Sequence, residues 1–256
     1  MPYIGGSRSK PRVMIPILLF FTAHWYLSLF SQTFFLHRYA AHNMFEMSKG
    51  WERFFFLFSC ITQGSSYLSP NTYGVLHRLH HAHVDTPLDP HSPSYDRNFF
   101  SMMWRTRQFF ADIFYGRADI DPKYLKDLPE WRTFDWYANK WYVRGAFGLG
   151  YVAFYITFAT AWWQYLLLPA HFLMGPLHGV IINWFAHKYG YRNFDTNDTS
   201  VNLMPVDIFM LGEGFHNNHH RHGHRANFGV KWFELDPVYP FIWTFDKLGM
   251  IRLKVG

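Results

Sequence analysis

Three long apolar windows constrain the fold of this chain more than any other feature of its 256 residues. The first window, residues 13–36, contains no lysine, arginine, aspartate or glutamate. The second, residues 143–168, contains only Arg144, and the third, residues 169–186, has no formal charge. A helix needs about 20 mostly apolar residues to cross a bilayer. The windows therefore predict membrane-spanning helices.

The rest of the chain is polar or has shorter apolar runs. Residues 54–68 are apolar but include the polar run 63–66, so we expect an interfacial helix here rather than a span. The regions 77–140 and 188–256 are polar, and we expect them to fold together as a cap on one membrane face. The predicted fold class is all-α integral membrane, with three or four transmembrane helices and a cytosolic helical cap in a single domain over the whole chain.

The order of these segments also predicts a topology. Pro169 stands between the second and third windows and predicts a tight turn, so that both ends of a helical hairpin lie on the side of the cap. Only one window precedes residue 37. We therefore expect the N-terminus, with Arg8, Lys10 and Arg12, on the opposite side.

Charge and cysteine content limit the partners and the metal ligands that the chain can use. The net charge is +6, but the basic residues are scattered between aromatic stretches, which favours an anionic membrane surface over nucleic acid as partner. Cys60 is the only cysteine, which excludes an intramolecular disulfide and a cysteine-rich metal cluster. Histidine would therefore have to bind any metal.

Nine of the sixteen histidines occur in four ordered motifs. These are, in chain order, His37-Arg-Tyr-Ala-Ala-His42, His77-Arg-Leu-His80-His81, Asn183-Trp-Phe-Ala-His187 and His216-Asn-Asn-His219-His220. Nine imidazoles are too many for one metal ion and about right for two. Imidazole binds iron, zinc, copper and nickel, so the motifs predict a two-metal site without identifying the metal.

Helical spacing predicts how each motif is arranged. Residues at i, i+3 and i+4 share a helix face, so the second and fourth motifs can each direct three imidazoles to one place. Asn183 and His187, at i and i+4, add ligands from a separate helix. His37 and His42 are five residues apart, roughly 140° around an α-helix, so we expect that helix to end or bend between them.

The remaining histidines have weaker interpretations. Three histidines stand alone inside the apolar windows: His24, His171 and His178. Such isolated histidines are usually core residues, and the functional alternative is a place along a substrate tunnel. Others flank the motifs and can support the metal ligands; these are His83, His91, His222 and His224.

The motif order resembles the membrane fatty acid desaturases, most closely the acyl-CoA Δ9 (stearoyl-type) branch. The flanking residues are similar too: Arg38 after His37, Asp85-Thr-Pro-Leu-Asp89-Pro-His-Ser-Pro93, Asn183-Trp-Phe-Ala-His187-Lys-Tyr-Gly-Tyr-Arg192, and Gly212-Glu-Gly-Phe-His216. The resemblance covers about residues 30–230.

The resemblance implies a metal centre and a reaction. The nine motif histidines would bind two iron ions (Fe2+/Fe3+), and Asn183 would contact one of them through water; the histidines are His37, His42, His77, His80, His81, His187, His216, His219 and His220. With O2 and two electrons, the enzyme would remove two hydrogens from adjacent carbons of a saturated fatty acyl chain. The products would be a cis double bond and water.

The resemblance also implies partners. The acyl chain would be carried by CoA, by a lipid or by acyl carrier protein, and electrons would come from cytochrome b5, ferredoxin or rubredoxin with its reductase. We expect a bacterial inner-membrane enzyme, surrounded by membrane lipid, whose active site faces the cytoplasm. The animal acyl-CoA enzymes have charged CoA contacts just ahead of the second motif, whereas residues 69–76 here have no charge.

Several polar residues would assist the centre. Asp85, Asp89 and Glu213 can orient ligand histidines through hydrogen bonds. Arg78, Arg192 and Arg221 can contact the phosphates of an acyl carrier or an electron donor.

Two other functions fit parts of the pattern. A hydroxylase of the same membrane di-iron clan would insert a hydroxyl group instead of forming a double bond, and product analysis separates the two. A membrane metal transporter would place ionisable ligands inside the spans, whereas here the motifs lie at span ends and in polar regions.

Overall fold

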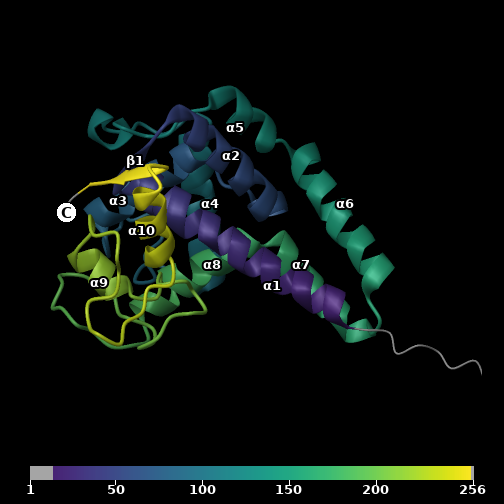
Figure 1. Cartoon of the computed structure of the whole chain (residues 1–256). Coiled ribbons are helices and arrows are strands. Elements are labelled where there is room, and N and C mark those ends of the chain that lie inside the picture. The colour runs from purple at the N-terminus through teal and green to yellow at the C-terminus, as the bar shows by residue number, and fades with distance from the viewer. Residues whose placement is uncertain (1–13, 255–256) are drawn as a thin grey trace, which may run out of the picture.

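The computed structural model describes residues 14–254, which form a predominantly helical protein with one short two-stranded sheet (Figure 1). The predicted helical character is confirmed, and the basic residues Arg8, Lys10 and Arg12 lie outside the described residues. The elements are, in chain order, α1 (Ile15–Phe30), a π-helix (Ser31–Ala41), β1 (Phe45–Met47), α2 (Lys49–Gln63), a 3-10 turn (Gly64–Ser66), α3 (Pro70–His83), α4 (Phe99–Phe114), a 3-10 turn (Pro122–Leu125), α5 (Arg132–Ala138), α6 (Trp141–Phe158), a 3-10 helix (Trp162–Leu167), α7 (Leu168–Phe172), α8 (Met174–Asn183), a 3-10 turn (Phe185–His187), α9 (His216–Arg221), α10 (Tyr239–Lys247) and β2 (Ile251–Leu253).

α1 and the π-helix form one continuous helix of 27 residues, Ile15–Ala41, which is long and apolar enough to cross a membrane. A second stretch meets the same criteria only if Trp162–Phe172 and Met174–His187, which are bent by 73° from each other, count as one span. Within residues 14–254, length and composition therefore support one or two spanning helices. The three or four predicted from the apolar windows are not confirmed by this criterion.

The second and third apolar windows are divided differently from the prediction. α6 ends at Phe158, and the backbone is extended at Ala159 and Ala161. Pro169 lies in the first turn of α7. Proline suits this position because its missing N–H has no helical acceptor there and its fixed φ matches the helix. The predicted turn at Pro169 is therefore wrong, and the break in the helix precedes it.

The apolar stretch 54–68 lies mainly in α2, whose N-terminus is capped by the side chain of Ser48. Phe55 and Phe56 are buried, whereas Phe54 and Ile61 on the same helix are exposed. α2 thus presents apolar side chains both to the protein core and to the outside. This distribution is compatible with the interfacial helix that the sequence predicts.

An aromatic core surrounds the C-terminal half of the long helix. Its buried members include Phe34 and Phe35 of the π-helix, which pack on Phe55 of α2 with ring centroids 4.8 and 5.7 Å apart. β1 and β2 pair antiparallel beside this core, with Phe45 opposite Leu253. Aromatic side chains bury large areas and dominate packing energetics, so this core fixes the π-helix in place.

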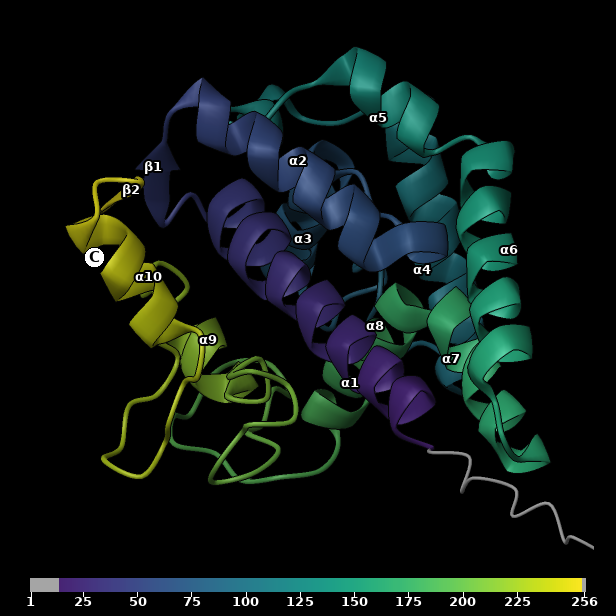
Figure 2. The ribbon, with the colours of Figure 1, turned by 45° about the vertical axis from the view of Figure 1, so that its right-hand side comes forward.

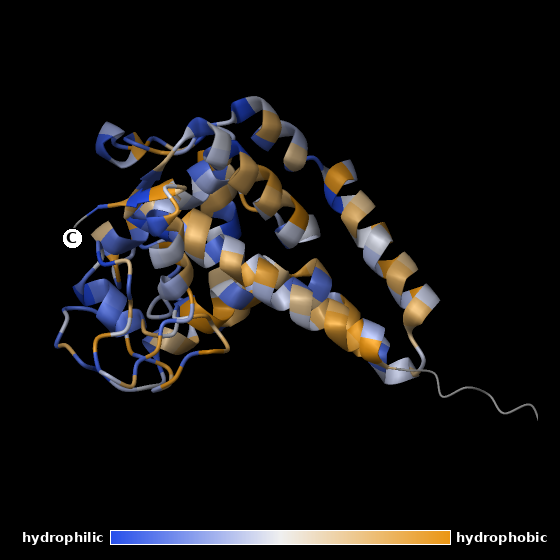
Figure 3. Ribbon diagram, in the orientation of Figure 1, coloured by the Kyte–Doolittle hydropathy of each residue, from blue (hydrophilic) through white to orange (hydrophobic). Residues whose placement is uncertain are grey.

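The arrangement in space separates polar from apolar parts. α1 runs diagonally through the molecule, and α3, α9 and α10 gather around the π-helical end of the long helix (Figure 2). The end of α6 lies near the N-terminal end of α1 (Figure 2). Hydrophilic residues concentrate around α9 and its loops, while α1 and α6 are largely hydrophobic (Figure 3). The histidine motifs therefore lie at the polar end of the molecule.

Candidate metal centre

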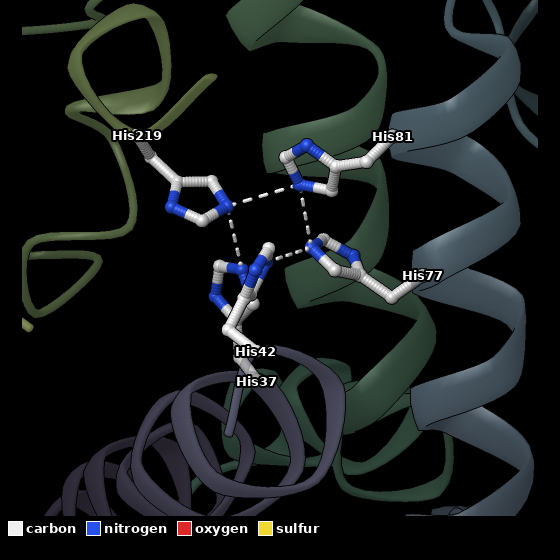
Figure 4. A group of neighbouring side chains, drawn as sticks. All are labelled: His37, His42, His77, His81 and His219. Atoms are coloured by element: carbon white, nitrogen blue, oxygen red, sulfur yellow. Dashed lines mark hydrogen bonds between the residues drawn. The ribbon is translucent and has the colours of Figure 1, made fainter. Parts of the chain in front are cut away.

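The nine motif histidines come together in two groups. In the first, one ring nitrogen from each of five histidines lies within 4.8 Å of the others; the members are His37, His42, His77, His81 and His219 (Figure 4). In the second, four histidines meet the same limit; the members are His80, His187, His216 and His220. The two groups are in contact, since the rings of His81 and His220 are 4.6 Å apart. The predicted two-metal site is thus matched by two groups that can each hold one ion.

Each HxxHH motif is divided between the two groups. On α3, the Nε2 atoms of His77 and His81 are 2.9 Å apart in the first group, whereas His80 belongs to the second. On α9, His219 joins the first group, and its two motif partners join the second. The prediction that each motif directs all three imidazoles to one place is wrong. Consecutive residues of an α-helix point about 100° apart, so adjacent histidines belong to different groups.

A change of helical winding brings His37 and His42 to the same group. The helix ends at Ala41, between the two histidines as predicted, but its last eleven residues are π-helical. The N–H of His42 donates to the carbonyl of His37 at 3.1 Å, an i→i+5 bond. Because this wider turn takes more residues than an α-helical turn, residues five apart come close to the same face. Their rings are 5.0 Å apart.

Arg78 holds the end of the π-helix beside α3. Its guanidinium donates to the carbonyls of Ala40 and Ala41 at 3.0 and 2.7 Å, and to the carbonyl of Lys126 at 2.5 Å. The last carbonyls of a helix have no partner inside the helix, so these bonds satisfy them. Arg78 therefore positions the first motif beside the second, and its main donors are not free to bind an acyl carrier.

Two buried carboxylates hold histidines of the second group. Nδ1 of His80 lies 2.9 Å from Oδ1 of Asp89, and Nδ1 of His220 lies 3.0 Å from Oδ2 of Asp198. Burial raises the pKa of each carboxyl, but the hydrogen bonds that it accepts, that of its histidine above all, outweigh burial, so both pKa values lie below the usual range. The carboxylates thus keep a proton on Nδ1 and leave Nε2 with its lone pair.

The prediction that Asp89 orients a ligand histidine is confirmed as a contact, whereas Asp198 was missed. Asp198 lies in the loop between α8 and α9, outside every motif. The signal that could have found it is its place shortly after the third motif, which matches the place of Asp89 shortly after the second.

Glu213 and Asp85 act on the other ligands. Oε2 of Glu213 lies 2.7 Å from Nδ1 of His37, and Asp85 reaches His187 indirectly. Nδ1 of His187 is 3.0 Å from Oγ1 of Thr199, whose hydroxyl donates to Oδ2 of Asp85 at 2.8 Å. Both acidic residues were predicted to orient histidines, and both contacts support that role; Thr199 was not anticipated from the sequence.

A buried arginine compensates the acidic residue beside the first group. Arg38 is fully buried, and its guanidinium donates to Asp236 at 2.7 Å and contacts Glu213 at 3.4 Å. Its guanidinium carbon also lies 3.7 Å from the ring centroid of Phe228. The sequence assigned Arg38 no role beyond the family resemblance, and no sequence motif pointed to Asp236.

The nitrogen atoms of both groups fit metal ions. In the first group, Nε2 contacts of 2.9–3.1 Å join His42 to His77, His77 to His81, His81 to His219 and His219 to His37 (Figure 4). Burial, followed by the neighbouring imidazoles, holds the pKa of His77 and of His81 well below the usual value. The rings of His77 and His81 are therefore neutral at pH 7. The Nε2 atoms of His77, His81 and His219 each meet two neighbouring Nε2 atoms, but an imidazole nitrogen has only one in-plane proton or lone pair and cannot pair with both. A cation at the centre would accept the lone pairs of all these nitrogens.

The second group supplies the same kind of donors. Within residues 14–254, Nε2 of His80 and Nε2 of His220 are buried and have no hydrogen-bond partner. Nε2 of His187 and Nε2 of His216 are 3.0 Å apart. A histidine whose outer nitrogen is held by a carboxylate, with the inner nitrogen free, has the usual arrangement of a metal ligand. Asn183, at the end of α8, is not a member of either group but lines the adjoining cavity.

A cavity of about 890 Å³ opens from the two groups into the helices. At its metal end it is lined by His37, His77, His91, His216 and Asn183. Elsewhere its walls are mostly apolar, with Leu29, Met103, Phe110, Phe172 and Ile182 among them. Such a space can hold an extended apolar molecule beside the metal ligands.

The histidines of the apolar windows lie outside both groups. Nδ1 of His24 is 2.6 Å from Nδ1 of His171, and the hydroxyl of Tyr155 lies 2.9 Å from Nε2 of His171. The ring of His178 packs edge-on against Trp25. None of the three histidines lines the cavity, so their predicted alternative role along a substrate tunnel has no support among the described residues.

A sequence profile of the family described as "Fatty acid desaturase" matches residues 11–250. The chain belongs to the fatty acid desaturase family. It is therefore an oxidoreductase that desaturates fatty acyl chains, and the resemblance based on the four motifs is confirmed.

Individual relatives of this desaturase share about a quarter to a third of its residues. The chain is 28% identical over 251 residues to the sn-1 stearoyl-lipid 9-desaturase of Anabaena variabilis, covering 97% of this chain and 85% of that protein. It is 28% identical over 252 residues to the sn-2 palmitoyl-lipid 9-desaturase of Nostoc sp. (strain 36), with 91% and 79% covered. It is 27% identical over 228 residues to the acyl-CoA 5-desaturase AL21 of Anemone leveillei, with 87% and 66% covered.

Proposed function

We propose that this desaturase binds two iron ions in its two histidine groups and introduces a cis double bond at carbon 9 of a saturated acyl chain. The single observation that carries the proposal is the division of the motif histidines into groups of five and four beside one apolar cavity. The position of the double bond rests on the names of the two 9-desaturases of Anabaena and Nostoc.

The five histidines of the first group would hold one iron. The four histidines of the second group, with Asn183 through a water molecule, would hold the other. When bound, the two irons supply the reduction of O2 that drives removal of two hydrogens from the substrate. Imidazole ligands suit iron, and a site without carboxylate ligands leaves more positive charge on the metals than a carboxylate-bridged site does.

The chain's own residues position the substrate. Methylene C–H bonds along an acyl chain are nearly identical in reactivity, so selectivity has to come from where the chain is held. The apolar walls between α4 and α8, including Met103 and Ile182, would hold one carbon pair beside the histidine groups and exclude bulk water. Asp89, Asp198 and Glu213 would keep the ligand imidazoles in fixed orientations.

The carrier that we favour is a membrane lipid. Two of the three relatives above are named for acyl-lipid substrates and one for acyl-CoA. The uncharged stretch Ser69–Leu76 offers no phosphate contacts ahead of the second motif. Arg107 and Lys140 line the cavity and are basic residues that a lipid phosphate could meet, whereas the guanidinium of Arg144 already donates to the carbonyls of Ser65 and Tyr67.

We further propose how the desaturase lies in the membrane. The helix Ile15–Ala41, α6 and the bent segment from Trp162 to His187 would span or enter the bilayer of a bacterial inner membrane. α2 would lie in the interface, with Phe54 and Ile61 toward lipid. The polar regions 77–140 and 188–256 would form a cytoplasmic cap, reached by a small electron carrier such as cytochrome b5, ferredoxin or rubredoxin with its reductase.

The test is a fatty-acid profile from a desaturase-deficient host that supplies its own electron chain. The wild-type chain should give a new monounsaturated acid with a cis double bond at carbon 9, found first in intact membrane lipids. A His219→Ala variant should give none. A hydroxy acid in place of the unsaturated acid would assign the chain to the hydroxylase branch. A new double bond found first in acyl-CoA would identify CoA, and not a lipid, as the carrier.

A further inference from the structure

His91 is a buried histidine that belongs to neither metal group. It follows Asp89 and Pro90 in the turn between α3 and α4, and it is only 3% exposed. Its backbone N–H donates to Oδ1 of Asp89 at 3.0 Å, and its ring packs against the ring of His80, tilted by 34°, with centroids 4.2 Å apart. The same carboxylate that orients a ligand of the second group therefore also fixes His91.

The ring of His91 faces the cavity with both of its nitrogens available. Within residues 14–254, neither Nδ1 nor Nε2 of His91 has a hydrogen-bond partner, although both are buried. The residue lines the cavity at its metal end together with His77 and His216. A neutral imidazole has one donor and one acceptor, and a buried polar group without partners is costly. The geometry thus calls for a small polar ligand inside the cavity.

A third metal ion explains the geometry less well than water does. One ring nitrogen of His91 lies within 4.8 Å of a nitrogen of His80 and an oxygen of Asp89, a spacing that a metal could use. The oxygens of Asp89, however, already accept from Nδ1 of His80 and from the backbone N–H groups of Asp85 and His91. A water molecule can use the free donor and acceptor of His91 without breaking these bonds.

We propose that His91 is a positioning residue that holds an ordered water molecule at the metal end of the acyl cavity. This inference rests on the proposed function. The reaction releases water into a space whose other walls are largely apolar, and His91 supplies a fixed hydrogen-bonding point for it there. Water held on His91 stays beside the second group and away from the carbon pair that is to react. O2 reduction therefore stays coupled to hydrogen removal from the acyl chain.

Two variants separate hydrogen bonding from packing. His91→Phe keeps a ring that can pack against His80 but removes both nitrogens, whereas His91→Gln restores a donor and an acceptor. His222→Phe is the matched control, because the structure leaves this histidine exposed and outside the metal groups and the cavity, without the ligand-supporting role that its place beside the fourth motif suggested. The purified holoenzyme and each variant are compared for metal content, product formed per O2 consumed and hydrogen peroxide released, and a high-resolution structure is determined for the wild type and for His91→Phe.

The expected result has three parts. His91→Phe keeps two irons per chain, forms product about tenfold more slowly, as loss of one hydrogen bond predicts, and releases more peroxide. His91→Gln recovers most of the coupling. The wild-type structure shows an ordered oxygen within hydrogen-bond distance of a ring nitrogen of His91, and His91→Phe lacks it.

Other results overturn the inference. Full coupling in His91→Phe, an absent water in the wild-type structure, or the loss of a metal ion from both variants would each contradict a water-positioning role. If the variants do not fold, the wild-type structure alone decides. A wild-type enzyme that forms no unsaturated product contradicts the proposed function instead, and the structural comparison still tests the water site.

Discussion

Asp89 holds His80 with both of its carboxylate oxygens, which lie 2.9 and 3.0 Å from Nδ1 of the imidazole. Neither residue is exposed to solvent. The carboxylate fixes the tautomer and orientation of a histidine whose Nε2 belongs to the second metal group. The metal affinity of the centre therefore depends on residues that never touch the metal.

Asp89→Asn should weaken iron binding by roughly 10–100-fold, because an amide can present a donor to Nδ1 and no longer selects the right tautomer. Competitive titration of the purified variant with a metal chelator measures the affinity. Asp112→Asn, which removes an exposed carboxylate paired with Arg117, should leave the affinity unchanged. Equal affinities in Asp89→Asn and wild type would contradict the role assigned to this carboxylate.

The division of the fourth motif between the groups predicts different metal losses for adjacent histidines. His219→Ala removes a ligand of the first group only, and His220→Ala removes a ligand of the second only. Each variant should retain about one tightly bound iron per chain and lose desaturase activity, since both irons are needed for the reaction. Metal analysis after dialysis measures the content, with His222→Ala as the control. Loss of both irons in both variants would show that the two groups do not bind independently.

Arg38 should be a large contributor to stability. It is fully buried between Asp236 and Glu213, so Arg38→Met leaves two buried carboxylates without their cation. Removing one partner of a buried ion pair costs about 3–5 kcal/mol. Arg117→Met breaks an exposed pair and should cost less than about 1 kcal/mol. Thermal unfolding in detergent compares them, and similar melting temperatures for the two variants would rule out the stabilising role of Arg38.

Stability should fall as pH rises through the titration range of Asp135. This carboxyl accepts hydrogen bonds from the hydroxyls of Tyr67 and Ser69 at 2.6 and 2.9 Å, but burial outweighs them and raises its pKa to about 6. Since the folded pKa lies above the unfolded value, the folded state binds the proton more tightly. This group's contribution is therefore full below about pH 4 and is lost by about pH 6, a change of roughly 3 kcal/mol.

Asp135→Asn tests this pH dependence, because the amide cannot titrate and can still hydrogen-bond both hydroxyls. Between pH 4.5 and pH 7, the melting temperature of the variant should rise relative to that of the wild type. A constant difference over that range would show that Asp135 is already ionised in the folded protein at pH 4.5.

Local spacing predicted which histidines form the centre but not how they divide between the two metal groups. His77 and His80 are three positions apart, which places them on one helix face, yet each contributes to a different group. The motif read alone does not show that the centre has two histidine groups, so it does not show which group each imidazole joins. The same limit applies to His37 and His42, whose shared position needs a π-helix that no local sequence rule predicts.

Residues that support the ligands were predictable only where they lie next to a motif. Asp89 and Glu213 are close in sequence to the histidine motifs and were identified, whereas Asp198, Thr199 and Asp236 come from loops that reach the centre through the tertiary fold. The apolar windows correctly predicted helical structure, but not the number of helices long enough to span a membrane. Their breaks were not predicted, because Pro169 is equally acceptable in a turn and in the first turn of a helix.

The most direct test of the central claim is the metal content of the purified, active enzyme, measured together with its activity after metal removal and reconstitution. Two groups of five and four histidines predict two iron ions per chain, with activity lost on chelation and regained only when iron is returned. Zinc at both sites in fully active enzyme, or full activity with a single iron per chain, would contradict the di-iron assignment.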